Sequence, residues 1–407
     1  MAYVHGVTIT DGGTLGAQIS LGGSTYPVFV GSAWGLTTKG TAPLTPKKIN
    51  NFQEYIETFG WAKRDGVVLD YSAPDHTYNL DEVAFLFFKK YKIGPVVFIN
   101  VFDGTVHTSG EPLVPDVSVV DETDIALGLE LIEGAMTELT FIPSHIAAPR
   151  YSMIPALKVV MQDYNSVGGF PVMVVMDCDD NPVNTDVAAK AAAIIEATAI
   201  TTKNVYLCWP ARGGYPLSAI AVALAEWVTI TQYAGIPMGS PSNKEILIPF
   251  ATGDRIVLAA WTNALNEVSI ATWRQIRSKC VLYGHQLAPF DFGGVADYVN
   301  DSYMPRRMRN YIEERILTEM VDSVDEPTNL RLIEDVVAKL NDFGGALLGK
   351  GALLGFRVDF FAEKNPLADL AVGKMTFSVT LLTPTEAGHI NFDIITDLTY
   401  LTTLFGA

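Results

Sequence analysis

Hydrophobic residues between positions 80 and 209 alternate between helical spacing and short continuous runs. Residues 80–91 (LDEVAFLFFKKY) have helical spacing, with acidic residues in the first turn and lysines in the last, which favours the helix dipole. The apolar run at 94–102 (GPVVFINVF) then indicates a strand. The same alternation predicts helices at 124–136, 154–164 and 185–199, and strands at 26–30, 139–142, 171–176 and 205–209. Continuous apolar strands between helices are typical of an α/β fold whose central, mostly parallel sheet carries helices on both faces.

The pattern differs at both ends of the chain. The first twenty residues hold only short apolar pieces between Gly and Thr, too few for a core, which favours an extended arm. After about residue 265 the pattern predicts an α+β domain, with helices at 304–324 and 328–348 and antiparallel-style strands at 352–362, 374–383 and 389–401. We therefore expect four parts: an N-terminal linking arm (1–20), an outer or central α/β domain (21–265), a C-terminal α+β domain (266–383) and one or more C-terminal linking strands (384–407).

The composition points to a protein whose surface is largely covered by other chains. Apolar residues make up 49% of the sequence and charged residues 18%, with a mean hydropathy of +0.23; a soluble monomer usually has about 25% charged residues. A large, well-buried α/β protein is the alternative interpretation. The net charge of −17 disfavours direct nucleic-acid binding, which needs clustered Lys and Arg.

Several classes of site and location are disfavoured by the residue pattern. The three cysteines (Cys178, Cys208 and Cys280) are far apart and lack CxxC spacing, so we expect neither a disulfide framework nor a zinc site, and a reducing cytoplasm fits. The six histidines are dispersed without ligand spacing. No targeting segment is expected at the N-terminus. The apolar run 217–236 contains Glu226 and Gln232, so a packed helix is expected there and no membrane insertion.

The main indication of enzymatic chemistry is an Asp-x-Asp pair that follows an apolar strand. Asp177 and Asp179 in VVMDCDDN resemble the start of haloacid-dehalogenase-type phosphotransferases, in which such residues act as nucleophile and general acid beside Mg²⁺. That family expects Thr or Val where Asn181 stands. The alternative is a solvated turn, because Asp-Asp-Asn-Pro has strong turn chemistry. On that interpretation, Asp177→Ala is expected to leave assembly unchanged.

Two further segments carry weaker indications of binding. The run GGALLGKG at 344–351 is close to a phosphate-binding P-loop, but Gly351 replaces the hydroxyl residue and the segment leaves a predicted helix, which favours a glycine-rich helix end. The densest basic patch contains Arg306, Arg307 and Arg309. This patch faces an acidic partner on one interpretation and forms a solvated helix start on the other.

The order of the motifs along the chain resembles contractile tail sheath proteins of the phage and R-type pyocin kind. The N-terminal half contributes His5-Gly6-Val7, NFQEYIETFG at 51–60, the helix-then-strand unit at 78–101 and GIPMGSPSNK at 235–244. The C-terminal part contributes RNYI at 309–312, EPTN at 326–329, GALLG at 351–355, NP at 365–366, GKM at 373–375 and PTEA at 384–387. No single motif is specific, whereas their order over almost the whole chain is.

The resemblance implies a structural subunit, not an enzyme, without cofactors or metal. Such subunits form stacked six-fold rings around a tail tube, with baseplate and tail terminator proteins as further partners, and contract to drive the tube through a cell envelope. The expected location is the tail of a virion or phage-tail-like particle assembled in a bacterial cytoplasm. The C-terminal domain would face the tube, with Arg306, Arg307 and Arg309 as candidate contacts.

The resemblance also implies linking arms that complete a sheet shared with neighbouring subunits. The expected N-terminal contact residues are Val4, His5, Gly6, Val7, Thr8 and Ile9, and the C-terminal ones are Ile390, Phe392, Ile394, Leu398 and Tyr400. Backbone groups left unpaired in such arms are satisfied by strand addition. Two alternatives stay open: a Mg²⁺-dependent α/β phosphotransferase using Asp177 and Asp179, and another large shell or scaffold protein.

Overall fold

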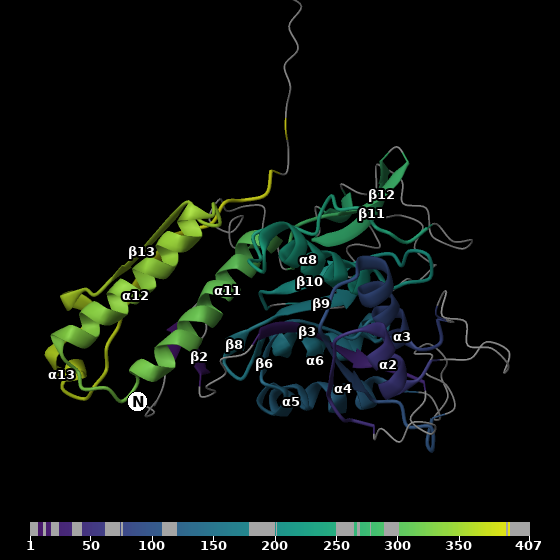
Figure 1. Cartoon of the computed structure of the whole chain (residues 1–407), viewed down its shortest axis with the longest axis horizontal. Coiled ribbons are helices and arrows are strands. Elements are labelled where there is room, and N and C mark those ends of the chain that lie inside the picture. Colours follow the sequence, from purple (N-terminus) through teal and green to yellow (C-terminus); the bar gives the residue numbers. More distant parts are fainter. Residues whose placement is uncertain are drawn as a thin grey trace, which may run out of the picture.

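The computed structural model describes most of the chain and shows a large α/β body beside a smaller helical and β unit (Figure 1). The described residues are 7–10, 14–17, 24–34, 43–61, 74, 76–107, 120–178, 200, 202–249, 264–266, 269–276, 278–288, 301–387 and 390. The predicted helix at 185–199 lies outside them. Among these residues, no helix is both long enough and apolar enough to cross a membrane.

The α/β body is built on an eight-stranded sheet with the order β12-β11-β10-β9-β6-β3-β5-β4. Its strands are β3 (Ser24–Gly31), β4 (Lys47–Ile49), β5 (Val96–Asn100), β6 (Phe141–Ala147), β9 (Met173–Asp177), β10 (Val205–Cys208), β11 (Ile270–Ile276) and β12 (Lys279–Tyr283). The six inner strands are parallel, and the edge strands β4 and β12 are antiparallel to their neighbours. Strands β5, β6 and β9 are buried throughout because helices cover both faces, which explains their continuous apolar sequences. The predicted fold class is confirmed.

Helices cover the two faces of the sheet as Figure 1 shows. One face carries α8 (Leu217–Tyr233), and the other carries α4 (Glu122–Glu130), α5 (Ile132–Leu139) and α6 (Pro155–Gln162). The remaining helices of the body are α2 (Phe52–Phe59) and α3 (Asn79–Ala84), which continues as a π-helix over Phe85–Tyr91. The first eight residues of α8, together with several later ones, are buried, so this apolar segment is a packed helix, as predicted.

The short elements of the body mark its turns. Two 3-10 turns span Tyr151–Met153 and Asp163–Asn165, and β7 (Ser166–Val167) pairs with β8 (Phe170–Pro171). The N-terminus of α4 is fixed by a capping box in which Asp121 and Asp124 exchange hydrogen bonds with each other's backbone N–H.

The C-terminal unit contains two long helices and a β-hairpin. Its helices are α11 (Tyr303–Met320), α12 (Leu330–Gly349) and the short α13 (Leu367–Leu370), with 3-10 turns at Val321–Ser323 and Ala362–Lys364. Strands β13 (Gly355–Asp359) and β14 (Ser378–Leu382) pair antiparallel. Two small apolar clusters separate from the main core pack this unit, and one of them includes Ile236 from the segment after α8. The two predicted helices and the first two β-rich segments are therefore present, whereas the third, 389–401, lies outside the described residues apart from Ile390.

Two boundaries differ from the expected division of the chain. The main sheet includes β11 and β12, so it continues past residue 265 to Tyr283. The sequence pattern predicted no strand between 266 and 303, so nothing in it placed these residues in the main sheet. At the N-terminus, β1 (Val7–Thr10) and β2 (Thr14–Ala17) pair with each other as a hairpin, and β1 lies near α11. The described part of the arm therefore folds back on itself and is not extended.

Candidate functional site: a buried polar network and an open β-edge

Asp177, the residue at the centre of the enzymatic hypothesis, is enclosed at the carboxyl end of β9. It is 2% exposed. Its Oδ1 accepts a hydrogen bond from the backbone N–H of Ser218 (2.9 Å), and its Oδ2 accepts from the Ser218 hydroxyl (2.6 Å) and from the backbone N–H of Arg150 (3.0 Å). Burial raises the pKa of Asp177, and the hydrogen bonds from Ser218 and Arg150 oppose that change. The carboxylate thus caps the first turn of α8 and fixes the loop after β6.

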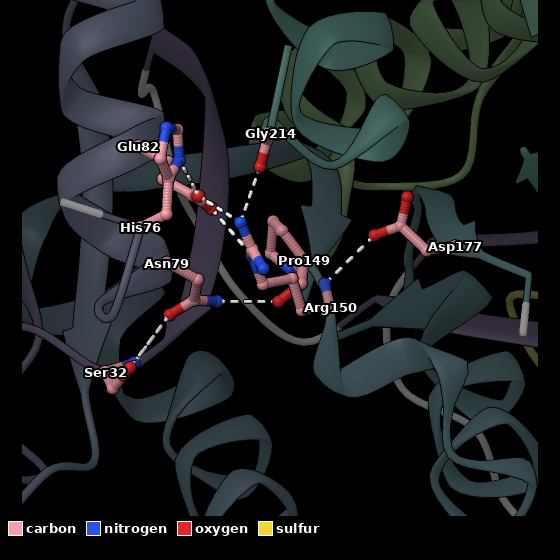
Figure 2. A network of polar contacts seen from close by, with 8 residues as sticks. All are labelled: Ser32, His76, Asn79, Glu82, Pro149, Arg150, Asp177 and Gly214. Carbon is pink, nitrogen blue, oxygen red and sulfur yellow. Dashed lines mark hydrogen bonds and ion pairs between the residues drawn. The ribbon is translucent and has the colours of Figure 1, made fainter. Parts of the chain in front are cut away.

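Arg150 extends this network to two other segments, as Figure 2 shows. Its guanidinium Nε lies 3.0 Å from Glu82 Oε2, a second nitrogen pairs with Glu82 Oε1, and the same nitrogen donates to the carbonyl of Gly214. His76 Nδ1 lies 2.6 Å from Glu82 Oε1, and the Glu82 side chain is fully buried. A buried forked ion pair of this kind fixes the relative positions of α3, the loop after β6 and the turn before α8.

Asn79 closes the network at the end of β3. Its Oδ1 accepts from the backbone N–H of Ser32 (2.7 Å), and its Nδ2 donates to the carbonyl of Pro149 (2.8 Å). The site lies where α/β proteins commonly bind ligands, at the carboxyl ends of parallel strands. In this protein, the polar groups at that position form hydrogen bonds and ion pairs with one another, so the network holds the surrounding segments together.

These contacts do not support the role of Asp177 as a nucleophile. A nucleophile must reach the phosphorus of a substrate, whereas both oxygens of Asp177 are engaged by the protein. Its partner Asp179 and Asn181 lie outside the described residues. Within the described ranges, no group of three or more His, Cys, Asp or Glu side chains is arranged to hold a metal ion. The alternative, a solvated turn at Asp-Asp-Asn-Pro (179–182), lies outside the described residues and stays a prediction.

The cysteines in the described body are core residues. Cys178 and Cys208 are at most 1% exposed and Cys280 is 7% exposed. Burial raises the pKa of the Cys208 thiol far above its ordinary value, so this thiol stays protonated and unreactive.

Most of the proposed basic patch on α11 is buried. Arg306 and Arg307 are 5% and 6% exposed, and Arg306 Nε donates to the side chain of Asn204. Arg309 is partly exposed and pairs with Glu313 at 3.0 Å. The prediction that Arg306 and Arg307 form an accessible contact is therefore wrong for the isolated chain. The reason is that this side of α11 packs on the body. The many charged residues of the helix had suggested a solvent-exposed surface instead.

Buried polar groups join α11 to the sheet. His145 on β6 lies 2.6 Å from the hydroxyl of Tyr303 through Nε2 and 2.8 Å from Glu226 Oε1 through Nδ1. Further along α11, the hydroxyl of Thr25 donates to Glu314 Oε1 at 2.9 Å. Since these groups are buried and paired, they specify the position of the helix on the body. Sequence reasoning missed this network because its members lie on segments far apart in the chain.

The glycine-rich segment resembling a P-loop belongs to α12. Gly344, Gly345 and Gly349 lie within the helix, and Gly351 follows it with a positive φ of 73°. A P-loop instead runs from a strand into a helix. Gly344 is required by packing, because a Cβ there would lie 1.8 Å from a ring carbon of Phe356. The interpretation as a glycine-rich helix end is confirmed.

The C-terminal unit exposes many of the large apolar side chains of the described structure. Nine of the seventeen exposed ones lie in it: Leu330, Leu348, Leu354, Phe361, Leu367, Val372, Val379, Leu382 and Ile390. Leu367 and Val372 are 84% and 79% exposed. A concentration of this kind on so small a unit is typical of a surface that other chains cover.

The outer edge of β14 is the accessible backbone edge of this unit. On β13, the N–H and C=O of Val358 point away from β14, because the Asn341 side chain bonds both, at 3.0 and 3.1 Å. Val358 lies opposite Val379 in the register, so the backbone groups of Val379 point away from β13, as do those of Leu381 two residues on. No strand of the described structure pairs with that side of β14. Asn341 thus covers the β13 edge, and β14 remains open.

The predicted arm residues fall partly outside the described structure. Val7, Thr8 and Ile9 lie in β1, whereas Val4, His5 and Gly6 lie outside. Ile390 is 66% exposed, and Phe392, Ile394, Leu398 and Tyr400 lie outside. Sequence reasoning named the arms but not the edge that would receive them. The alternation in SVTLL at 378–382 predicted the strand, yet nothing local showed which side stays unpaired.

The comparisons with known proteins agree with this architecture. No family model matches the chain. The tail sheath protein of Burkholderia phage BcepMu is 24% identical, and the match covers 99% of both chains. Among solved structures, a chain of the anti-feeding prophage baseplate matches with a TM-score of 0.67 at 16% identity, covering 98% of this chain and 100% of the other. A chain of the PVC sheath complex in its contracted state, from an extracellular contractile injection system, matches with a TM-score of 0.66 at 17% identity over 98% and 99%.

A sheath tail protein from Listeria innocua shares the fold more distantly. Its TM-score is 0.52 at 12% identity, with 88% of this chain and 95% of the other covered. The fold is therefore that of contractile tail sheath proteins. The resemblance found in the order of the sequence motifs is confirmed, and the chain is similar to these proteins over its whole length.

Proposed function

We propose that this chain is the structural subunit of a contractile tail sheath. In this role it polymerises as stacked hexameric rings around a tail tube and contracts to drive the tube through a target cell envelope. The observation that supports this most strongly is whole-chain similarity, in sequence to a phage tail sheath protein and in fold to chains of contracted sheaths and a baseplate. The particle would be a virion tail or a phage-tail-like device assembled in a bacterial cytoplasm.

The linkage between subunits would use strand addition at the β14 edge. The backbone groups of Val379 and Leu381 are positioned to accept an extended strand, and strand addition satisfies such groups in many complexes. The predicted linking segments of neighbouring subunits, Val4–Ile9 and Ile390–Tyr400, would supply the added strands, and β1 would either leave its hairpin with β2 or pair through its free edge. Such links would hold subunits together while rigid bodies rotate during contraction.

The exposed apolar residues of the C-terminal unit support its place inside the assembly. Leu367 and Val372 are almost fully exposed in the isolated chain, and their burial against another protein would be favourable. We assign this unit to the side of the tail tube, with Arg309 as the one basic residue of the former patch that is accessible there. Baseplate and tail terminator proteins would contact the rings at the two ends of the sheath.

A non-enzymatic role follows from the same proposal. The energy for contraction would be stored in differences between subunit interfaces, so no nucleotide site is needed. The competing phosphotransferase hypothesis requires a reachable Asp177, and the hydrogen bonds of that carboxylate oppose it.

Blocking the β14 edge tests the proposal. Val379→Pro removes an outward N–H that β13 does not use, so the hairpin should persist while strand addition fails. Val379→Thr keeps that N–H and the preference for a strand, and is the matched control. In negative-stain electron microscopy we expect helical tubes from wild type and Val379→Thr, and none from Val379→Pro. Tubes of normal length from the proline variant would overturn the linkage.

Deleting residues 1–20 tests the other half of the linkage. The truncated protein should keep the far-UV circular dichroism of the full chain and remain soluble, because the described core starts at β3. It should not polymerise. Normal tubes from the truncated protein would show that the N-terminal segment is not a linking arm.

A further inference from the structure

The N-terminus of α11 is capped by a residue from a distant part of the chain. Ser302, at the N-cap position, makes no side-chain capping hydrogen bond. Instead, Glu386 Oε1 accepts a hydrogen bond from the backbone N–H of Met304, in the first turn of α11, at 2.8 Å. This bond satisfies a donor that the first turn of a helix leaves unpaired, and the helix dipole offsets only part of the cost of burying the charge. Glu386 thus binds the segment 383–387, which follows β14, to the helix that joins the two units.

The second oxygen of this carboxyl group is enclosed. Glu386 Oε2 is shielded from solvent and has no hydrogen-bond partner in the described structure, although the residue as a whole is partly exposed. An enclosed carboxylate oxygen without a partner destabilises the charged form more than the neutral acid. Glu386 therefore connects segment 383–387 to α11 at a place where its ionised form is destabilised.

We propose that Glu386 is a proton-controlled latch: the neutral acid holds segment 383–387 on α11, and ionisation weakens this hold. The geometry supports such a role because Glu386 lies just before the C-terminal segment that is predicted to link subunits. Burial raises the pKa of Glu386 to about 7, and the N–H groups of Met304 and Glu386 itself oppose this change. Ionisation would therefore occur near neutral pH.

The direction of the pH effect follows from these values. In the released segment the pKa of Glu386 returns towards the ordinary value of 4.5, whereas in the docked segment it is about 7. The docked state therefore holds the proton more tightly. Its stability is fully present below pH 4.5, falls as pH rises towards 7 and levels off above that value. At the largest, the docking equilibrium weakens by about 300-fold across this range.

Other ionisable groups lie near Glu386, and their contributions to any pH effect must be distinguished from that of Glu386. Tyr206 and Tyr303 interact electrostatically with Glu386, and burial raises both of their pKa values far beyond this range. The backbone carbonyl of His285 accepts from Tyr303 N–H, and burial lowers the His285 pKa. The remaining charged or titratable groups around this end of α11 are Cys208, Asp301, Arg306, Arg307, and the pair His145 and Glu226.

Hydrogen exchange in the full-length, unassembled chain tests the latch. The amide of Met304 is bonded to Glu386, so its protection factor, corrected for the intrinsic pH dependence of exchange, reports docking. We expect this factor to fall tens-fold between pH 5 and pH 8 in wild type. Glu386→Gln is isosteric and permanently neutral, so its protection should stay high and constant. Glu386→Asp is too short to reach Met304 and should lose protection at every pH.

Two outcomes would overturn the latch. A wild-type protection factor that is constant from pH 5 to pH 8 would show that ionisation does not weaken docking. An equal fall in wild type and Glu386→Gln would assign the effect to another group, and His285→Asn would then identify or exclude the nearest histidine. Far-UV circular dichroism of each variant confirms the fold. The latch is a property of the isolated subunit, so its failure would leave the proposed sheath function intact; only its use in releasing a linking arm rests on that function.

Discussion

Replacing Asp177 with alanine should destabilise the α/β body strongly. The substitution removes an acceptor of three hydrogen bonds from Ser218 and Arg150 and leaves these donors buried at the start of α8. Hydrogen bonds to charged groups contribute about 1.5–3 kcal/mol each, and an unsatisfied buried donor costs about 1–3 kcal/mol. Burial of the charge, which raises the pKa of Asp177, offsets part of this contribution. We expect the free energy of unfolding to fall by about 2–4 kcal/mol.

An exposed aspartate with a similar backbone role provides the control. Asp121 is exposed and caps α4 by accepting from the N–H groups of Thr123 and Asp124 at 2.8 and 3.1 Å. Loss of such a cap costs about 1 kcal/mol. Urea unfolding followed by tryptophan fluorescence and circular dichroism compares the two alanine variants. If Asp177→Ala loses no more stability than Asp121→Ala, the network does not hold the body together as described.

Two further predictions concern packing and pH. Gly344→Ala should lower stability by about 1–3 kcal/mol, because its Cβ would collide with Phe356; Gly345→Ala, whose Cβ meets nothing within 4 Å, should be neutral or stabilising in the same thermal melts. Burial lowers the pKa of His145, so the folded protein favours the neutral ring, and stability should fall as pH drops below about 6.5, by at most about 1.4 kcal/mol per pH unit. His145→Gln should reduce the fall in melting temperature between pH 6.5 and pH 5.5, and an unchanged profile would contradict the assignment.

The sequence predicted the parallel sheet well because its strands are buried on both faces. A strand such as β5 must be apolar at every position, and the helices between strands show regular spacing, so both signals are local. The order of the strands and the place of β11 and β12 were not predictable in this way. These strands join the main sheet through contacts with residues far away in the chain.

The polar parts of the structure were predicted less well, for a physical reason. A charged side chain looks like a surface residue unless its buried partner is known. Arg306 and Glu82 are buried because they meet Asn204 and Arg150, from segments far away in sequence. The open edge of β14 was not predicted for the same reason. Only the position of Asn341 on α12 shows which strand edge is already covered.

Cryo-electron microscopy of the purified chain, assembled alone and on its tail tube, tests the central claim most directly. We expect helical tubes of six-fold rings with a bore wide enough for the tube, in which a strand from a neighbouring subunit lies beside Val379 and Leu381. Closed shells, flat sheets, or a chain that stays monomeric with the tube and baseplate present would contradict the sheath function. Tubes in which that edge of β14 stays bare would contradict the proposed linkage.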